Sequence, residues 1–276
     1  MTTTSTAKVA LVTGASSGIG EATARQLAAA GFTVYAAARR TERLQKLAQA
    51  GIHPIAMDVT DDASVQRGIA AVHARAGRID AVINNAGNAL MGAIEDTSVE
   101  EARAQLETNF FGVFRVCRAV LPIMRAQGGG HIVNISSLAG VLGLPFSGLY
   151  SASKFALEGM TESLRLETRR FGIKVVLIEP GDFRSDLATV RRTAAAAAAN
   201  DAYGAAFARF KAQQEKDEAV APTPEPIAQL VEQVLAADRP RLRYHVGMLS
   251  QRIVVPLKRW LPQRLFETAL VRALGL

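Results

Sequence analysis

A chain of 276 residues is long enough to bury one large α/β core, and 49% hydrophobic with 21% charged residues is typical of a folded globular protein. The single cysteine, Cys117, excludes an intramolecular disulfide and a four-cysteine zinc site. The first apolar run, residues 9–12, is too short for a signal peptide or a membrane span, so we expect a cytoplasmic protein.

The net charge of +7 comes mainly from the end of the chain. Residues 241–276 hold seven basic side chains and one acidic side chain, Glu267. Neither a recognition helix nor a set of interleaved aromatic residues stands out among these cations, so we do not expect nucleic acid as a partner. We also expect no metal site, because the four histidines lack metal-ligand spacing: His53, His73, His131 and His245.

Short apolar runs alternate with longer helical patterns along most of the chain, which predicts β-α-β units with right-handed crossovers. The expected fold is an α/β fold, a Rossmann-like doubly wound parallel sheet in a single domain with a C-terminal helical extension. The predicted strands are residues 9–13, 33–38, 53–57, 81–84, 131–136 and 175–179. The predicted helices are residues 18–30, 41–50, 62–76, 99–127 and 150–171.

The regular pattern weakens over residues 183–223. A connection of this length inside a compact domain is more often a substrate lid than an inert loop. We predict a catalytic domain over residues 1–246 that includes this loop, followed by a basic, apolar C-terminal extension over residues 247–276.

A glycine-rich turn joins the first predicted strand to the first helix. Glycines allow the backbone to turn tightly and to approach a pyrophosphate, while the N-terminus of the following helix attracts its charge. A turn of this kind is weak evidence alone, but the strand before it and the helix after it support a dinucleotide site. The predicted contacts are Gly14, Ser16, Ser17, Gly18, Ile19 and Gly20.

The end of the second predicted strand indicates which coenzyme binds. In NAD enzymes an acidic residue at this place binds the adenosine ribose, but here Ala38 occupies it. Arg39 and Arg40 follow, and both are suited to a 2′-phosphate. We therefore predict NADP(H) rather than NAD(H), the alternative being that the two arginines are a solvated pair at the start of a helix.

Tyr150 and Lys154 are four residues apart on a predicted helix, so their side chains lie within about 40° on one face. A free tyrosine, with a pKa near 10, is a poor base at neutral pH. We expect Lys154 to lower the pKa of Tyr150 by stabilising the phenolate. Ser137 ends a predicted strand at the edge where open parallel sheets bind ligands, and its hydroxyl could polarise a substrate carbonyl.

Together these motifs resemble the short-chain dehydrogenase/reductase family. The resemblance covers residues 8 to about 185 and includes several independent motifs in family order. They are Thr13-Gly14-Ala15-Ser16-Ser17-Gly18-Ile19-Gly20, Asp58-Val59, Asn84-Asn85-Ala86-Gly87, Asn109, Ser137, Tyr150 with Lys154, and Pro180-Gly181.

The resemblance implies roles for residues that the pattern alone leaves undefined. Asp58 and Val59 would contact adenine, and Asn85, Ala86 and Gly87 would line the coenzyme cleft. Asn109 would complete a catalytic tetrad by holding a water at a helix kink. The segment with Pro180, Gly181, Phe183 and Ser185 would bind the nicotinamide end, although Phe183 and Ser185 depart from the usual residues.

The expected reaction is hydride transfer between nicotinamide and a small-molecule carbonyl or alcohol, with Tyr150 as proton donor and acceptor. The segments around Tyr150 resemble the hydroxysteroid and retinol dehydrogenase branch, which favours a bulky apolar substrate, steroid- or retinoid-like. Alternatives are a 3-oxoacyl or small-ketone reductase and, from another class, a non-catalytic NADP(H)-binding regulator. The intact Asn109, Ser137, Tyr150 and Lys154 argue against the regulator.

Two predictions concern contacts outside the site. The resemblance implies a homodimer or homotetramer formed through the helices at residues 99–127 and 150–171. The tail mixes apolar residues with spaced cations, and it could pack on its own domain, form an oligomer contact or rest on an anionic membrane surface. Of these we favour packing on its own domain.

Overall fold

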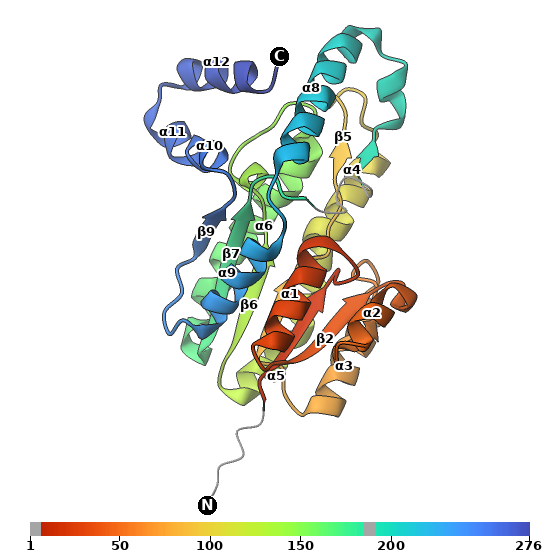
Figure 1. Ribbon diagram of the computed structural model, residues 1–276, viewed down its shortest axis with the longest axis vertical. Helices are drawn as coiled ribbons and strands as arrows, with labels where there is room; N and C mark the ends of the chain where they lie inside the picture. Colours follow the sequence, from red (N-terminus) through yellow and green to blue (C-terminus); the bar gives the residue numbers. More distant parts are fainter. Residues whose placement is uncertain (1–6, 185–190) are drawn as a thin grey trace, which may run out of the picture.

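The centre of the molecule is a parallel β-sheet of seven strands, seen in the computed structural model, which describes residues 7–184 and 191–276. The strand order is β3-β2-β1-β4-β6-β7-β9 (Figure 1), and every neighbouring pair is parallel. The strands are β1 (Val9–Thr13), β2 (Thr33–Ala38), β3 (His53–Ala56), β4 (Ala81–Asn84), β6 (Gly130–Ile135), β7 (Ile173–Pro180) and β9 (Arg243–Val246). The predicted fold class is confirmed.

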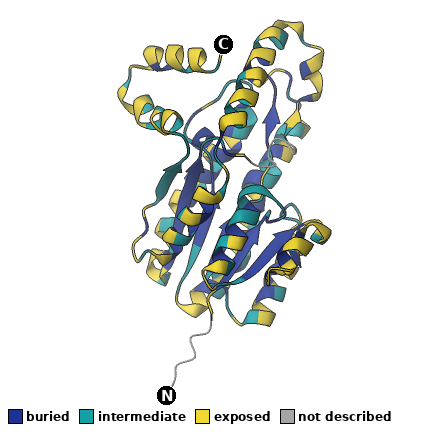
Figure 2. Cartoon of the chain, viewed as in Figure 1, coloured by how far each residue is buried: buried dark blue, intermediate teal, exposed yellow. Residues whose placement is uncertain are grey.

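Helices cover both faces of the sheet and bury alternate side chains of its strands. On one face Ala10 and Val12 pack under α1 (Gly18–Ala29), α2 (Gln45–Ala48) and α9 (Glu225–Ala236). On the other face Val9 and Leu11 pack under α3 (Asp62–Ala76), α5 (Gly112–Gln127) and α6 (Gly148–Thr168). Figure 2 shows the strands as the most deeply buried layer, as expected for a sheet covered on both sides.

The order of the strands fixes where a ligand can bind. From β1 the chain moves outward to β2 and β3, and then returns across β1 to β4 and β6. The loops that follow β1 and β4 therefore diverge at the carboxyl edge of the sheet. This divergence is the crevice in which doubly wound folds bind ligands.

Two predicted helices were wrong in detail. The helix predicted over residues 99–127 is α4 (Val99–Leu106) and α5 joined by a π-helical segment, Glu107–Phe111. Gly112, the first residue of α5, lies so close to Val59 that a Cβ on Gly112 would come within 2.9 Å of Val59 Cγ2. The predicted helix over residues 41–50 is a 3-10 turn, Thr41–Leu44, followed by the short α2.

The C-terminal third contains elements that the sequence pattern did not define. Strand β9 extends the sheet beyond the last predicted strand, and α8 (Asp201–Val220) forms much of the predicted substrate loop. A second, small sheet pairs β5 (Leu90–Met91) with β8 (Arg192–Thr193). After β9 come the three tail helices, α10 (Leu249–Arg252), α11 (Val254–Trp260) and α12 (Gln263–Ala273).

The tail helices pack on the loop that follows β6. Phe266 is buried with Leu138 and Leu142, and Val254 and Leu261 pack against this cluster. Lys258 Nζ also donates a hydrogen bond of 2.6 Å to the carbonyl of Val141. The favoured packing on the chain's own domain is thus present. Within the described ranges, every helix is too short or too polar to cross a bilayer.

Candidate active site

A cavity of about 1050 Å³ opens at the carboxyl edge of the sheet, where the loops after β1 and β4 diverge. Most of the predicted site residues line it: Gly14, Ser16, Ser17, Gly18, Ile19, Arg39, Arg40, Asp58, Val59, Asn85, Ala86, Gly87, Ser137, Tyr150, Lys154, Pro180, Gly181 and Phe183. Gly20 and Asn109 are buried outside this lining. Ser185 lies outside the described residues.

The glycine-rich turn at the cavity depends on glycine at two positions for different reasons. Gly14 has a φ of +63°, and a Cβ there would come within 2.7 Å of Ala86 Cα. A Cβ on Gly20 would come within 2.4 Å of the carbonyl oxygen of Gly14. Any side chain at these positions would separate the turn from the loop after β4, which forms the opposite wall of the crevice.

Thr13 and Asn85 hold the two walls together. Thr13 Oγ1 accepts hydrogen bonds from the backbone N–H groups of Asn85 and Ala86, at 3.0 and 3.1 Å. The Asn85 side-chain amide donates to the carbonyls of Thr13 and Gly14, at 3.0 and 3.1 Å. Asn85 therefore fixes the backbone of the turn. The sequence pattern predicts no individual role for Thr13, because its partners lie about seventy residues away.

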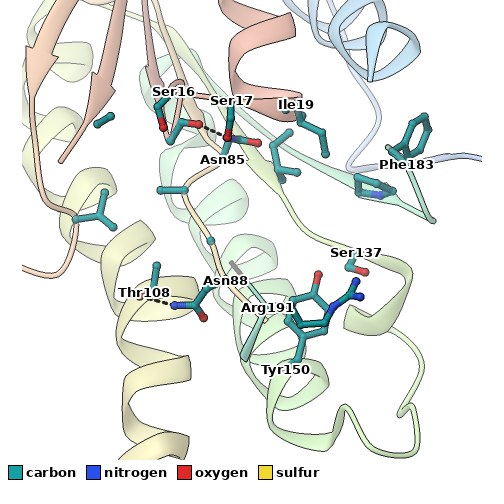
Figure 3. Close-up of a pocket in the computed structure, with 18 of the residues that line it drawn as sticks. Ser16, Ser17, Ile19, Asn85, Asn88, Thr108, Ser137, Tyr150, Phe183 and Arg191 are labelled. Atoms are coloured by element: carbon teal, nitrogen blue, oxygen red, sulfur yellow. Dashed lines mark hydrogen bonds between the residues drawn. The ribbon is translucent and has the colours of Figure 1, made fainter. Parts of the chain in front are cut away.

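The N-terminus of α1 faces the cavity. Ser17 is its N-cap residue, and it makes no side-chain capping hydrogen bond. Ser16, Ser17, Gly18 and Ile19 line the cavity beside it (Figure 3). A helix N-terminus with this exposure to a cavity favours an anion such as a pyrophosphate.

Three cations and one carboxylate lie at the far end of the cavity. Arg39, Arg40 and Arg43 line it just after β2, and Arg43 is an addition to the two arginines predicted. Asp58, after β3, accepts hydrogen bonds of 3.0 and 2.8 Å from the backbone and hydroxyl of Thr60. The Asp58 carboxylate is therefore held by Thr60 within the loop after β3, and the arginines make the end of β2 positively charged.

Ser137, Tyr150 and Lys154 meet at the opposite end of the cavity. Tyr150 and Ser137 face one another in Figure 3. Lys154 is buried; its Nζ lies 5.9 Å from the centre of the Tyr150 ring and donates a 2.8 Å hydrogen bond to the carbonyl of Ile135. The carbonyl comes from the last residue of β6, so the strand that presents Ser137 also holds Lys154.

The pKa of Tyr150 differs from the expectation. Burial raises it above the usual value for a tyrosine, and the nearby Ser137 hydroxyl opposes that shift. Burial also lowers the pKa of Lys154 to about 8, while the nearby Glu158 carboxyl opposes the change. The prediction that Lys154 lowers the pKa of Tyr150 was wrong. Among the protein's own groups, the cost of burying a phenolate outweighs the effect of the charges around it.

Asn109 lies in the π-helical segment between α4 and α5 and is fully buried. Its side-chain amide donates to the carbonyl of Asn88 at 2.9 Å and to Ser153 Oγ at 3.1 Å. Its Oδ1 accepts from the Asn88 backbone N–H at 3.0 Å. Asn109 therefore ties the loop after β4 to α6, the helix of Tyr150 and Lys154. No sequence motif marks Asn88 or Ser153 as partners of Asn109.

Further polar groups near Tyr150 come from the C-terminal third. Arg191 lines the cavity beside Tyr150 (Figure 3). It also forms an ion pair with Glu218 of α8. Asp182, next to Gly181, has a pKa raised by burial. Gln251 of α10 bonds to this residue twice, donating to Asp182 Oδ2 at 2.5 Å and accepting from its backbone N–H at 3.0 Å. No local pattern marks these long-range pairs.

Fold and site together define a Rossmann-like α/β protein with a ligand cavity at its switch point. The short chain dehydrogenase profile matches residues 8–196. A 3-ketodihydrosphingosine reductase of Bacteroides thetaiotaomicron is 39% identical over 95% of this chain and 96% of that protein. The chain belongs to the short-chain dehydrogenase/reductase family of oxidoreductases, as the sequence resemblance predicted.

Solved structures give the same result. A short-chain dehydrogenase from Streptomyces avermitilis has a TM-score of 0.82 and is 37% identical over 92% of this chain and 96% of that one. An actinorhodin polyketide ketoreductase solved with NADPH has a TM-score of 0.74 and is 33% identical over 87% of this chain and 95% of that one.

Proposed function

We propose that the protein is an NADP(H)-dependent oxidoreductase that interconverts a ketone or aldehyde and an alcohol on a bulky apolar substrate. The observation that carries this proposal is the meeting of Ser137, Tyr150 and Lys154 at one end of a cavity whose other end is lined by Arg39 and Arg40. The cavity thus has a place for proton transfer and a place for a phosphate.

The residues present fit NADP(H). The N-terminus of α1 offers donors for the pyrophosphate, with Gly14 and Gly20 allowing the close approach of the two walls. Arg39, Arg40 and Arg43 offer charge-assisted hydrogen bonds to a 2′-phosphate. The structural relative solved with NADPH supports the same choice.

The proposed mechanism assigns one task to each residue. A bound reduced nicotinamide would supply the hydride to the carbonyl carbon. Tyr150 Oη donates its proton to the carbonyl oxygen, and Ser137 Oγ donates a second hydrogen bond to that oxygen. The Lys154 ammonium stabilises the phenolate that remains, and Asn109 fixes the helix that carries both residues. Because burial raises the pKa of Tyr150, the phenol is protonated at neutral pH, and stabilisation of the phenolate by the Lys154 ammonium is needed to offset the weaker acidity.

Support for a bulky apolar substrate comes from the surroundings of this end of the cavity, where two packed apolar clusters adjoin the segments that carry Ser137 and Tyr150 without lining the cavity. One contains Leu138, Leu142 and Phe266. The other joins Phe207 and Phe210 of α8 to Leu90 and Phe146. The reductase relative, named for a ketone on a sphingoid base, supports the same class of substrate. In this proposal residues 1–246 form the catalytic domain. Its substrate side is formed by α8, within residues 183–223, and is completed by the extension at residues 247–276.

We also propose that the protein forms a homodimer or homotetramer through α4 to α6. Exposed apolar side chains on these elements support this contact, among them Phe111, Phe114 and Leu166. Light scattering of the purified protein tests it, and a monomer at all concentrations would refute it.

The function is tested by following NADPH absorbance with ketones of increasing apolar size, from a small ketone to a long-chain 3-oxo compound. We expect kcat/KM to rise with apolar size, because each buried methylene contributes about 0.8 kcal/mol. A preference for small ketones would favour the alternative reductase. No oxidation above that of Tyr150→Phe with any ketone would favour a non-catalytic NADP(H)-binding regulator.

A further inference from the structure

The tail helices α10 and α11 carry apolar side chains on a face turned away from the protein. Leu249, Ile253, Leu257 and Trp260 follow a spacing of four, four and three residues, which places them within about 80° on one helical face. Their exposed fractions are 74%, 50%, 38% and 81%. We call these four residues the outer stripe. Figure 2 shows how exposed this part of the molecule is.

The opposite face of the same helices is already occupied. Val254, Val255 and Leu261 pack on the cluster formed by Leu138 and Leu142. Lys258 bonds to the carbonyl of Val141, and its ammonium lies 5.4 Å from the centre of the Phe155 ring. Packing on the protein's own domain therefore explains the inner face only. The outer stripe has no part in it.

Cations surround the outer stripe. Arg252 and Arg259 lie along one side of it, at helical positions about 60° and 80° from Leu249. Both are exposed, as are Arg264 and Arg272 of the neighbouring α12. Residues 249–276 contain five basic residues and one acidic residue, Glu267. Trp260 is the most exposed member of the stripe, and tryptophan is typical of membrane interfaces.

We propose that the outer stripe docks on the surface of an anionic lipid bilayer, with α10 and α11 lying in the plane of the interface. Apolar area on one face flanked by arginines is the pattern that binds such surfaces. A second copy of the chain fits less well, because a symmetric contact would bring the cations of both copies together. Docking would place α10 and α11 between the bilayer and the loop of Leu138 and Leu142, which follows Ser137.

Trp260 is the only tryptophan of the chain, so its emission reports directly on the outer stripe. We expect vesicles of phosphatidylcholine mixed with phosphatidylglycerol to shift this emission to shorter wavelength and to protect it from acrylamide. Phosphatidylcholine alone should give a smaller shift. Raising the salt from 0.1 M to 1 M should release the protein, because the screening length falls from about 10 Å to about 3 Å.

Variants separate the apolar and the charged contributions. The double variant Leu249→Ser and Ile253→Ser keeps Trp260 and should lower vesicle partitioning by at least about tenfold. The double variant Arg259→Glu and Arg264→Glu should lower it by about fivefold for each arginine lost. Ile94→Ser is the matched control, because Ile94 is 71% exposed but lies outside the tail. Each variant is first checked for unchanged circular dichroism and ketone reduction.

Two outcomes would overturn the proposal. One is a Trp260 emission that anionic vesicles leave unchanged. The other is a shift that depends on protein concentration without vesicles and accompanies dimer formation in light scattering, which would assign the stripe to a second copy. Neither outcome bears on the proposed oxidoreductase activity, which is measured in the absence of lipid.

Discussion

The two ends of the cavity are built in different ways. The end at which we propose that the coenzyme binds, called the coenzyme end, lies between β1, β2 and β4, and its walls are backbone segments joined by hydrogen bonds of Thr13 and Asn85; the end with Ser137 and Tyr150 is called the substrate end. The substrate end depends on α8 and the tail helices, which join it through isolated side-chain contacts such as Arg191 with Glu218 and Gln251 with Asp182. The first end is specified by short motifs, whereas the second is specified by contacts between distant segments.

The sharpest test of the substrate end is Tyr150→Phe, which removes the hydroxyl and leaves the ring. We expect kcat for ketone reduction to fall about a thousandfold or more, because no other donor replaces the proton. The dissociation constant of NADPH should stay within a factor of about three. NADPH oxidation and fluorescence titration measure the two quantities.

Ser153→Ala serves as the matched control for this variant. It removes a hydroxyl from the same helix, but that hydroxyl accepts a hydrogen bond from Asn109 and has no proposed contact with substrate. Its rate should exceed that of Tyr150→Phe. If Tyr150→Phe kept a tenth or more of the wild-type rate, Tyr150 would not be the proton donor.

Arg243 joins β9 to the rest of the sheet, and its loss tests how the C-terminal third is held. The guanidinium lies 2.9 Å from Glu158 and 3.2 Å from Glu179, and it also pairs with Glu162. Arg243→Ala would leave two buried carboxylates without their cation, which should lower the free energy of unfolding by about 3 kcal/mol. Urea denaturation measures the change, with exposed Arg259→Ala as the control.

Adding Glu158→Gln to Arg243→Ala should recover part of that loss, because one of the buried carboxylates is then neutral. A loss below about 1 kcal/mol in Arg243→Ala would mean that β9 is held by its backbone pairing with β7 alone.

The local motifs explain why the coenzyme end was predictable. The helix predicted over residues 62–76 was confirmed to the residue, because Asp61 caps its start and Gly77, with a φ of +72°, ends it. The strands β1, β2 and β4 were likewise confirmed at their predicted bounds. Each of these signals lies within the segment that it defines.

The substrate end lacked such signals. Arg243, Tyr244 and His245 do not form an apolar run, and Arg243 fits at this place in the sheet through ion pairs with Glu158 and Glu179 from other elements. Burial from several elements likewise decides the pKa of Tyr150, which the four-residue spacing to Lys154 could not indicate. Gln251 meets Asp182 across 69 residues, so no pattern near either residue predicts the contact.

Arg39→Ala tests the coenzyme end. We expect the dissociation constant of NADPH to rise about thirtyfold, since a charge-assisted hydrogen bond contributes about 2 kcal/mol. The dissociation constant of NADH should not change, because NADH lacks the 2′-phosphate. Exposed Arg67→Ala is the control. Equal losses for both coenzymes would assign Arg39 to the fold, and no loss for either would refute its role in coenzyme choice.

The pH profile tests Lys154. Its pKa is lowered to about 8, so the ammonium is present below that pH and is lost above it. Because the ammonium stabilises the Tyr150 phenolate, kcat/KM for ketone reduction should be constant below about pH 8 and should then fall by up to tenfold per pH unit. Lys154→Arg should move this fall to higher pH, since arginine keeps its proton. A profile that stays flat to pH 10 would exclude the role.

Gln251→Ala gives the smallest expected effect and tests whether the tail acts on the coenzyme loop. Its amide makes two hydrogen bonds to Asp182, beside Pro180 and Gly181, which line the cavity. Losing these hydrogen bonds should weaken NADPH binding by about 1 kcal/mol, because the loop is then held less firmly in place. KM for NADPH should therefore rise about fivefold with little change in kcat. Gln263→Ala is matched, since Gln263 bonds only within α12, to Glu267. Equal KM values in the two variants would show that the coenzyme end holds its loop without the tail.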